Sequence, residues 1–463
     1  MSSPSTVAAL DLPPGAKVVV TGQQVGLLTG PLLTVLKAAR AISYAAEVAS
    51  SPATAAVVPL FWAAADDHDL AEVHHTYALN AQEEAQKFRI DLPLESAAAS
   101  EVEIPPDSAR RLLEELFAAA GVEPAAFPLT PFLPVGGDTL ASWFCRALRA
   151  VLGTHAPRIV VPAQLNRAGR SVYDQALRDD GAIRDALAAG AAANQAAGLA
   201  TPLPVDADPP LFVIERTARW RVRHGSRSGE FRVGEKTLSR AALLDLAHDG
   251  TPRLSANVAL RTILQAATLP CIAYVAGPTE LLYYRQLEPL HRLFAVPFPT
   301  LVRRPHATLL TTAAARAARK LNLEPDALRA ALDARAAAGP DRAAADPLLA
   351  RGEQLRGEVA AWLATLQEGR PALKSATERR STQLLQSFDG ALERARATLA
   401  DGALHAGARW STLERCVRPR GRPQERVLNI LPFLAERGPA LIEQLLALRG
   451  EPGADGVVPH SVL

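Results

Sequence analysis

The sequence predicts an α/β protein with a parallel-sheet core, inserted segments and a long antiparallel α-helical coiled-coil arm. Three observations predict this fold class. Two apolar runs separated by a helical stretch indicate a strand–helix–strand unit, in which the strands are parallel and the crossover is right-handed. A stretch of β-branched and aromatic residues between positions 201 and 240 interrupts this alternation. Beyond residue 312 the chain is almost wholly Ala, Leu, Arg and Glu, which favours long helices.

The composition argues against several classes of protein. The 463 residues are enough for two or three domains with a substantial core. Fifty basic and 48 acidic residues nearly cancel, so no overall field favours nucleic acid or an anionic membrane as a partner. The three cysteines lie far apart, which disfavours a disulfide scaffold and a thiolate zinc site. With no secretory signal and no apolar run of ~18 residues, we expect a cytoplasmic protein whose sequence requires no metal.

The first predicted strand and helix enclose a polar turn. Residues 18–20 are an apolar β-branched run, and Pro31 is a suitable first-turn residue for the following helix. A strand, a Gly-containing turn and a helix N-terminus form a site for an anionic ligand, because unpaired N–H groups and the helix dipole meet there. A purely structural turn is the alternative, since neither common nucleotide fingerprint is present.

The second predicted strand, residues 57–62, ends in a cluster of acidic residues and histidines. A helix starting near Asp67 would place His68, Glu72 and His75 on one face. Ligands of open α/β sheets bind beyond the carboxyl ends of the strands. Both polar stretches follow strand ends, so they are expected to meet at one edge of the sheet.

Three interpretations of the second cluster remain open. Histidine and carboxylate side chains on one helix face can bind a metal ion. Asp67, His68 and Asp69 can instead perform acid–base chemistry or recognise a substrate amine. In the third interpretation the aspartates only cap the start of a helix.

The middle of the chain alternates between helices and strands. A helix is predicted to start at Asp107 or Ser108, a second covers 140–153, a strand follows at 158–161, and residues 167–200 are helical. The stretch from 201 to 240 is predicted to be a small antiparallel insertion. Its arginines are assigned to a solvated strand face: Arg216, Arg219, Arg221, Arg223 and Arg227.

A third polar cluster follows the buried strand predicted at 271–276. The turn Gly277–Glu280 leads into a helix, and a further short strand at 299–302 ends in Arg303 and Arg304. Each cluster alone is compatible with an ordinary strand-to-helix turn. Three of them in one α/β region predict a shared cleft.

The C-terminal third is predicted to form the helical arm. Residues 346–368 and 372–417 are expected to be two long helices joined at 369–371, packed on a partner chain or on their own core. Arginines concentrate at 418–426, before a helix predicted at 427–434. They either hold phosphate or carboxylate groups or form solvated surface.

Five segments together resemble one family, the bacillithiol biosynthesis cysteine-adding enzymes, a family of cysteine ligases. They occur in the family's order and span nearly the whole chain: TGQQVGLLTGPLLTVLK (21–37), FWAAADDHDLAEVHHTY (61–77), LSANVALRTILQ (254–265), AYVAGPTELLYYRQLEPL (273–290) and RPRGRPQERVLNILPFL (418–434). The resemblance implies a Rossmann-type core with inserts and a coiled coil that forms a homodimer. We expect a catalytic core at 1–310 with inserts at about 81–135 and 165–250, a coiled-coil domain at 311–417, and a segment at 418–463 that packs back on the core.

The activity implied by the resemblance is the joining of cysteine to the amine of glucosaminyl-malate, the last step of bacillithiol synthesis. Such a ligase needs an energy donor, ATP or another nucleotide. Asp67, His68 and Asp69 are the expected catalytic residues, and Arg261 is a candidate partner for the malate carboxylates. The predicted substrate- or nucleotide-binding residues are Thr21, Gly22, Gln23, Gln24, Thr29, Gly30, Lys37, Glu72, His75, Asn257, Arg261, Gly277, Pro278, Glu280, Tyr283, Gln286, Arg304, Arg420, Gln424 and Arg426. The alternatives are a non-catalytic dimeric scaffold or binding protein, and a metal-dependent enzyme that uses His68, Glu72 and His75.

Overall fold

The protein is described by a computed structural model that covers residues 10–49, 56–67, 69–92, 97–123, 127–338, 347–368, 371–399, 404–451 and 460–463. The chain divides into two compact units. The first consists of Met1–Ala78, Gln86–Ala307 and Leu428–Ser461, and the second of Leu79–Ala85, Thr308–Val427 and Val462–Leu463. Among the described residues, no helix is long and apolar enough to cross a membrane.

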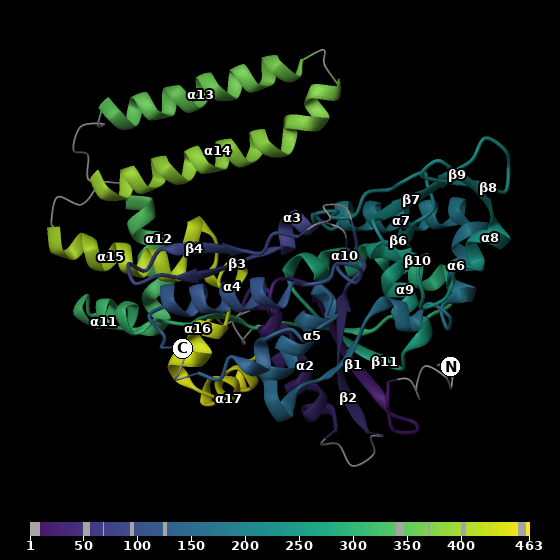
Figure 1. Ribbon diagram of the computed structural model, residues 1–463, viewed down its shortest axis with the longest axis horizontal. Helices are drawn as coiled ribbons and strands as arrows, with labels where there is room; N and C mark the ends of the chain where they lie inside the picture. Colours follow the sequence, from purple (N-terminus) through teal and green to yellow (C-terminus); the bar gives the residue numbers. More distant parts are fainter. Residues whose placement is uncertain are drawn as a thin grey trace. The chain divides into compact units, whose positions relative to one another are not determined.

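A five-stranded parallel sheet forms the centre of the first unit (Figure 1). Its strands are β1 (Lys17–Gln24), β2 (Val57–Ala64), β5 (Arg158–Val160), β11 (Cys271–Ala276) and β12 (Thr300–Arg303). The strand order is β12-β11-β1-β2-β5, and all four neighbouring pairs are parallel. The chain therefore extends from β1 to one side and later returns to the other side. This reversal between β1 and β11 is where doubly wound sheets bind ligands.

Both faces of the sheet are covered, as the apolar β-branched strands predict. Val18 and Val20 of β1 point into the larger apolar core, whereas Val19 packs on the opposite face with Ala41 and Ala45. The helices that contribute to the larger core are α6 (Arg170–Arg178), α7 (Asp180–Ala196), α9 (Val258–Thr268) and α10 (Pro278–Leu293). Helix α2 (Leu33–Ala49) contributes Ala41 and Ala45 to the opposite face, and Phe144 of α5 (Leu140–Leu152) packs on Phe61 of β2. The prediction of an α/β core with a parallel sheet is confirmed. Helix α2 begins at Leu33, two residues later than Pro31, because residues 31 and 32 form a turn.

The predicted antiparallel insertion is also present. Its strand order is β10-β6-β7-β8-β9. The strands are β6 (Leu211–Glu215), β7 (Ala218–His224), β8 (Glu230–Val233), β9 (Lys236–Ser239) and β10 (Arg253–Ala256), with the short helix α8 (Arg240–Leu244) before the last. A hairpin of β3 (His75–Leu79) and β4 (Ala85–Arg89), and helix α4 (Pro106–Ala119), form the earlier insertion. Helix α4 begins at Pro106 and not at Asp107 or Ser108, because proline suits a first helical turn.

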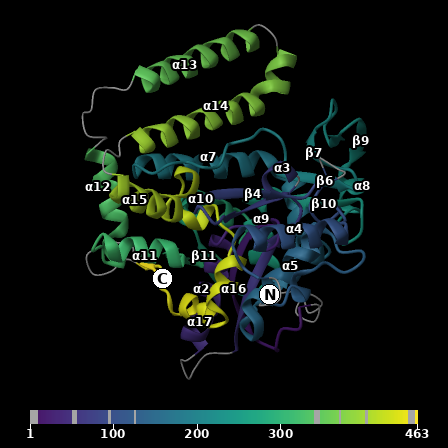
Figure 2. The ribbon, with the colours of Figure 1, turned by 60° about the vertical axis from the view of Figure 1, so that its left-hand side comes forward.

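The second unit is helical. Its helices are α11 (Thr312–Lys320), α12 (Leu328–Ala338), α13 (Pro347–Gln367), α14 (Pro371–Leu399) and α15 (Leu404–Val417). Helices α13 and α14 run side by side in Figures 1 and 2, and Arg356 Nη2 donates to Asp389 Oδ2 across them at 3.0 Å. The predicted helix at 346–368 corresponds to α13. The predicted helix at 372–417 corresponds to α14 and α15, and its residues 400–403 lie outside the described residues.

After the second unit the chain returns to the first. Helices α16 (Leu431–Arg437) and α17 (Ala440–Ala447) belong to the first unit, whereas strand β14 (His460–Val462), which pairs with β13 (His306–Thr308), spans the division. The helix predicted at 427–434 begins only at Leu431. The reason is local, since the Asn429 side-chain oxygen accepts a hydrogen bond from Leu431 N at 3.0 Å and caps the turn there.

Candidate active site

A buried cluster around Lys37 lies where the strand order reverses. The Lys37 ammonium, on α2, points back to the end of β1, where it donates to the carbonyl oxygen of Gly22 and to Gln23 Oε1 at 3.3 Å. It also forms an ion pair with Glu280 Oε2 at 2.6 Å, at the start of α10. Groups from β1 and α10 therefore converge on the ammonium group of α2. We call Gly22, Gln23, Lys37 and Glu280 the Lys37 cluster.

Glu280 is the most highly connected member of the cluster. Its Oε2 also accepts from Gly277 N at 2.7 Å, which caps helix α10. Its Oε1 accepts from the Tyr274 hydroxyl at 2.9 Å and from the Tyr283 hydroxyl at 3.2 Å. Arg261 Nη2 donates to the Tyr283 hydroxyl at 3.1 Å and so extends the network to α9. Both carboxylate oxygens are thus engaged, and the carboxylate is held in one orientation.

The electrostatics of the pair follow from its burial. Burial lowers the pKa of the Lys37 ammonium, and the Glu280 carboxylate offsets this only in part. Burial by itself would raise the pKa of Glu280, but the Lys37 charge and the hydrogen bonds to the carboxylate lower that pKa below its ordinary value. Glu280 is therefore ionised at neutral pH. The proton of Lys37 is held less tightly than that of an exposed lysine.

A second polar group follows the end of β2. Asp66 is buried, and its Oδ1 accepts from Arg253 Nη2 at 3.0 Å. Arg253, on β10, also donates to Ser100 Oγ at 2.8 Å and to Glu101 Oε1 at 2.6 Å. Asp66 thus anchors the loop after β2 to the antiparallel insertion and to the loop at 97–101. This role is structural, and it was not predicted from the sequence.

Asp67 lies beside this anchor and in contact with the end of β1. Its Oδ2 accepts a hydrogen bond from the Gln24 side-chain amide, and its Oδ1 accepts from Asp69 N at 3.4 Å. The Asp67 Oδ1 lies 4.0 Å from Arg219 Nη1 of β7. Gln24 and Asp67 are therefore in contact, as expected of the polar residues at the ends of β1 and β2. His68 lies outside the described residues.

The predicted helix face of His68, Glu72 and His75 does not form. Helix α3 covers only Leu70–Val73, and His75 already belongs to strand β3. The helix ends early because β-branched and aromatic residues from 73 onward pair in the hairpin. Among the described residues, no group of three His, Cys, Asp or Glu side chains could hold a metal ion.

Several predicted residues stabilise backbone within the first unit. Thr21 Oγ1 donates to Val275 O at 2.9 Å and ties β1 to β11. Asn429 Nδ2 donates to Gly30 O at 2.9 Å and lies 3.5 Å from Thr29 Oγ1. Gly30 has a φ of +66°, which favours glycine. The turn at 26–30 is thus held by the C-terminal segment.

Two predicted amide side chains form hydrogen bonds to backbone groups. The buried Gln286 side chain accepts from Leu203 N at 3.1 Å and donates to Leu203 O at 2.8 Å. Asn257 caps helix α9 by accepting from Leu260 N at 2.9 Å. Both roles are structural, and no signal in the sequence distinguished them from ligand contacts.

The remaining predicted residues divide between the two units. Gly277 and Pro278 open α10 beside Glu280, and the buried Arg304 Nη1 donates to Pro305 O at 2.8 Å. Arg420, Gln424 and Arg426 belong to the second unit. There the Gln424 amide is bonded to Leu309 N and Leu309 O at 2.7 and 2.8 Å, which makes it a structural link.

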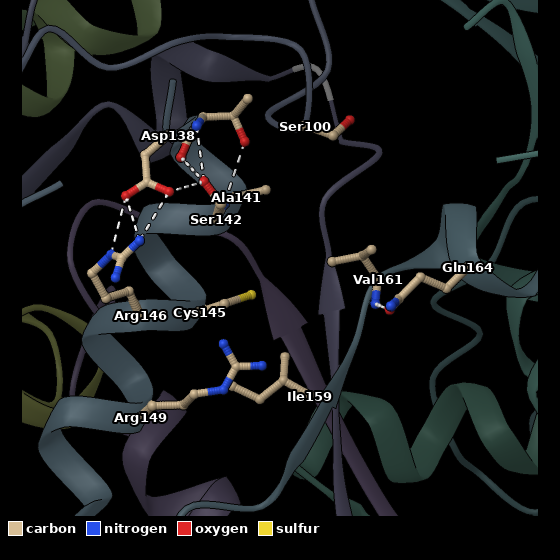
Figure 3. A pocket seen from close by; sticks show the side chains of 11 residues that line it. Ser100, Asp138, Ala141, Ser142, Cys145, Arg146, Arg149, Ile159, Val161 and Gln164 are labelled. Carbon is tan, nitrogen blue, oxygen red and sulfur yellow. Dashed lines mark hydrogen bonds and ion pairs between the residues drawn. The ribbon is translucent and has the colours of Figure 1, made fainter. Parts of the chain in front are cut away.

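A cavity of about 470 Å³ opens beside the carboxyl end of β5 (Figure 3). Ser100, which accepts a hydrogen bond from Arg253, forms part of its wall, so the cavity neighbours the Asp66 anchor. Burial raises the pKa of the Cys145 thiol in its wall to about 11, so that thiol is protonated at neutral pH. The lining residues are Ser100, Asp138, Thr139, Ala141, Ser142, Cys145, Arg146, Arg149, Ile159, Val161 and Gln164.

The prediction that the arginines of the insertion lie on a solvated strand face holds for only some of them. Arg216, Arg223 and Arg227 are exposed, as expected of a solvated strand face. The side chain of Arg219 is only 10% exposed and that of Arg253 only 2%. The alternation of residues along a strand shows which side chains share one face of the sheet. It does not show that this face packs on the loop after β2.

Two family models match consecutive parts of the chain. Residues 5–305 match the model described as "Bacillithiol biosynthesis BshC, N-terminal Rossmann-like domain". Residues 307–453 match "Bacillithiol biosynthesis BshC, C-terminal coiled-coil domain". These matches agree with the parallel sheet of the first unit and the paired helices of the second.

Full-length relatives show the same similarity. A protein of Geobacillus kaustophilus is 30% identical over 451 residues, which cover 93% of this chain and 82% of the relative. A protein of Koribacter versatilis is 28% identical over 463 residues, which cover 97% of this chain and 85% of the relative. Both relatives bear the name "Putative cysteine ligase BshC".

Proposed function

Because this chain belongs to the bacillithiol biosynthesis BshC family, we propose that it is a ligase joining the carboxyl group of cysteine to the amine of glucosaminyl-malate. The observation that carries the proposal is the Lys37 cluster at the reversal of the strand order, with Asp67 at the neighbouring strand end. This is the position at which doubly wound sheets bind their ligands.

The reaction requires that the carboxylate of cysteine be activated before an amine attacks it. We propose ATP or another nucleotide as the energy donor, because condensation in water is otherwise unfavourable. The protein has to hold a carboxylate, an amine and the phosphates in one orientation. The Lys37 ammonium is suited to an anionic group, since burial makes its charge costly and the Glu280 carboxylate offsets that cost only in part.

Asp67 is the residue we assign to the acceptor amine. Its carboxylate is oriented by Gln24 and by the backbone of Asp69, so it is preorganised to receive an ammonium group or a proton. His68 and Asp69 follow it directly in the sequence and complete the predicted acid–base group. Arg261 remains our candidate for the malate carboxylates.

The proposal is tested by product analysis. Purified protein is incubated with cysteine, glucosaminyl-malate and ATP, and thiols are identified by mass spectrometry. We expect a new thiol with the mass of the condensed product. No product under varied nucleotides and metals, with substrate binding still measurable, would instead identify a binding or scaffold protein.

The variant Asp67→Asn tests the role assigned to Asp67. We expect it to reduce product formation by at least roughly a hundredfold, the size of a general acid–base contribution, with an unchanged melting temperature. His68→Ala should behave likewise. Asp91→Asn is the control, because it makes the same chemical change on a side chain that is 89% exposed. Early melting of Asp67→Asn with normal activity of the folded fraction would show that Asp67 only supports the loop.

We also propose that the coiled coil mediates a homodimer. Helices α13 and α14 expose large apolar side chains, and Trp362 is 59% exposed. Exposed apolar side chains of this size on paired helices are typical of a surface that binds another chain. A second copy of this chain is the proposed partner.

A further inference from the structure

Arg219 and Arg253 extend from the same face of the antiparallel insertion towards the loop after β2. In the register of the sheet, Arg253 of β10 and Arg219 of β7 both lie opposite Ile214 of β6. Directly opposed residues of antiparallel strands share a face. The two arginines therefore stand on either side of Ile214, and they approach the consecutive carboxylates Asp66 and Asp67.

The two guanidinium groups differ in how well they are satisfied. Arg253 donates to Asp66, Ser100, Glu101 and Thr251 at 2.6–3.2 Å. This set of partners explains why a side chain that is 2% exposed can stay charged. Both Nη atoms of Arg253 are thus engaged in holding the fold, and only its buried Nε makes no hydrogen bond to a described residue.

Arg219 is buried with far fewer partners. Its Nη2 donates to Ala256 O at 3.3 Å, and its Nη1 lies 4.0 Å from Asp67 Oδ1, which is too far for a hydrogen bond. Its Nε is buried and makes no hydrogen bond to any described residue. The guanidinium stacks over the ring of Phe212 at 3.8 Å, which fixes its position without using its donors.

The surroundings keep Asp67 from satisfying Arg219. Gln24 and the backbone of Asp69 both bond to the Asp67 carboxylate and hold it at its present distance from the arginine. Burial lowers the pKa of the Arg219 guanidinium, and the charges of Asp66 and Asp67 offset this only in part. A buried cation with unused donors is a costly feature unless a ligand supplies the missing anion.

We propose that Arg219 binds a carboxylate group of a substrate beside Asp67. The planar guanidinium fork matches a carboxylate. A doubly charged phosphate is disfavoured at this point, because Asp66 and Asp67 would repel it more strongly than a single negative charge. The identity of the substrates rests on the proposed function, in which cysteine and the malate group of the acceptor both carry carboxylates. An amine of the bound substrates would then lie next to Asp67.

The test combines truncated ligands with substitutions and measures binding by calorimetry, so it does not depend on turnover. Cysteine is compared with cysteamine, which lacks the carboxylate, and glucosaminyl-malate with glucosamine, which lacks the malate. ATP is the third probe. The variants are Arg219→Ala and Arg219→Met, of which the second keeps an apolar stem over Phe212.

We expect both variants to weaken the carboxylate-bearing member of one pair roughly ten- to hundredfold, as for loss of a charge-assisted hydrogen bond. The truncated member of that pair should bind wild type and variants equally. Cysteine or glucosaminyl-malate, whichever is affected, is the source of the carboxylate. Arg219→Lys should restore only part of the affinity, because an ammonium lacks the fork.

Arg221→Ala is the matched control. Arg221 lies on the same strand and the same face, and its Nε also makes no hydrogen bond to a described residue, but its Nη2 forms a close ion pair with Asp206 at 2.8 Å and its side chain is 31% exposed. It should bind all ligands like the wild type. Three results would overturn the proposal. They are equal losses of affinity for intact and truncated ligands, a loss of affinity for ATP alone, and unchanged affinity for all ligands in folded Arg219 variants.

The outcome is separable from that of the proposed function. Carboxylate binding that depends on Arg219 without any condensed thiol would support the carboxylate site and refute the ligase. If the wild type forms the product and Arg219→Met leaves carboxylate binding unchanged, the result would support the ligase and refute the carboxylate site.

Discussion

At the scale of single residues, the first unit contains a buried ion pair whose partners are 243 positions apart in the sequence. Lys37 is almost fully buried, and the Glu280 side chain is 19% exposed. Removal of one partner of a buried pair leaves an uncompensated charge, which typically costs about 3–5 kcal/mol. The pair therefore belongs to the stability of the fold as well as to the proposed site.

Glu280→Gln is expected to lower the free energy of unfolding by about 3 kcal/mol, because Lys37 loses its counter-charge while the amide oxygen can keep one hydrogen bond. Urea denaturation measures this difference. Glu288→Gln on the same helix is the control. Its partner Arg292 is 70% exposed, so we expect a change within about 0.5 kcal/mol. Equal effects of the two substitutions would contradict the assignment.

The contribution of Glu280 should depend on pH with a definite sign. Its pKa in the folded protein lies below the ordinary value of 4.5. The ionised group therefore binds fewer protons in the folded than in the unfolded state, and stability is lost as the pH falls through the folded-state pKa. We expect the gap between wild type and Glu280→Gln to be constant from neutral pH down to about 5 and to shrink below 4.5. A gap that widens on acidification would reverse this sign.

At the scale of elements, helices α7 and α10 approach each other closely at a single glycine. A Cβ at Gly190 of α7 would overlap the backbone carbonyl of Gln286 on α10. Asn194 of α7 also donates to Leu282 O of α10 at 3.0 Å, so the two helices are fixed in register. Backbone cannot move aside as a flexible side chain can, and the helices must separate to admit a methyl group.

Gly190→Ala should therefore destabilise the protein by about 1–3 kcal/mol, the usual cost of overpacking. Gly181→Ala, on the same helix, should instead leave stability unchanged or raise it by about 0.5 kcal/mol, because no atom lies near its Cβ position and alanine favours helix. Thermal unfolding of both variants measures the contrast. A tolerated Gly190→Ala would show that the helices are further apart than described.

At the scale of the whole molecule, the exposed apolar side chains of the coiled coil predict self-association. We expect sedimentation analysis to show a dimer for the full chain and a monomer after deletion of residues 345–416. Trp362→Glu in the full chain should weaken the dimer, because a charge would be buried in the interface. Val135→Glu is the control, since Val135 is 54% exposed in the first unit. A deletion variant that stays dimeric would assign the interface to another surface.

The sequence by itself determined the order of the elements, the parallel core, the antiparallel insertion and the helical arm. Hydrophobic periodicity and turn residues act over short stretches, so the helices and strands that they specify can be predicted without knowledge of the fold. The positions of the polar clusters were predictable for a related reason. Parallel strands place their carboxyl ends at one edge, so residues that follow β1, β2 and β11 had to come near one another.

The roles of the individual side chains were decided only by the tertiary structure. Gln286 and Glu280 lie on the same helix, yet Gln286 bonds to the backbone of Leu203 whereas Glu280 binds Lys37. Asp66 is neutralised by Arg253, 187 positions away, whereas Asp67 has no such close ion pair with Arg219. Whether a polar side chain is a structural link or a ligand contact depends on which partners remain unsatisfied around it. Which partners remain unsatisfied is decided by packing between segments far apart in the sequence, so it cannot be predicted from the local sequence pattern.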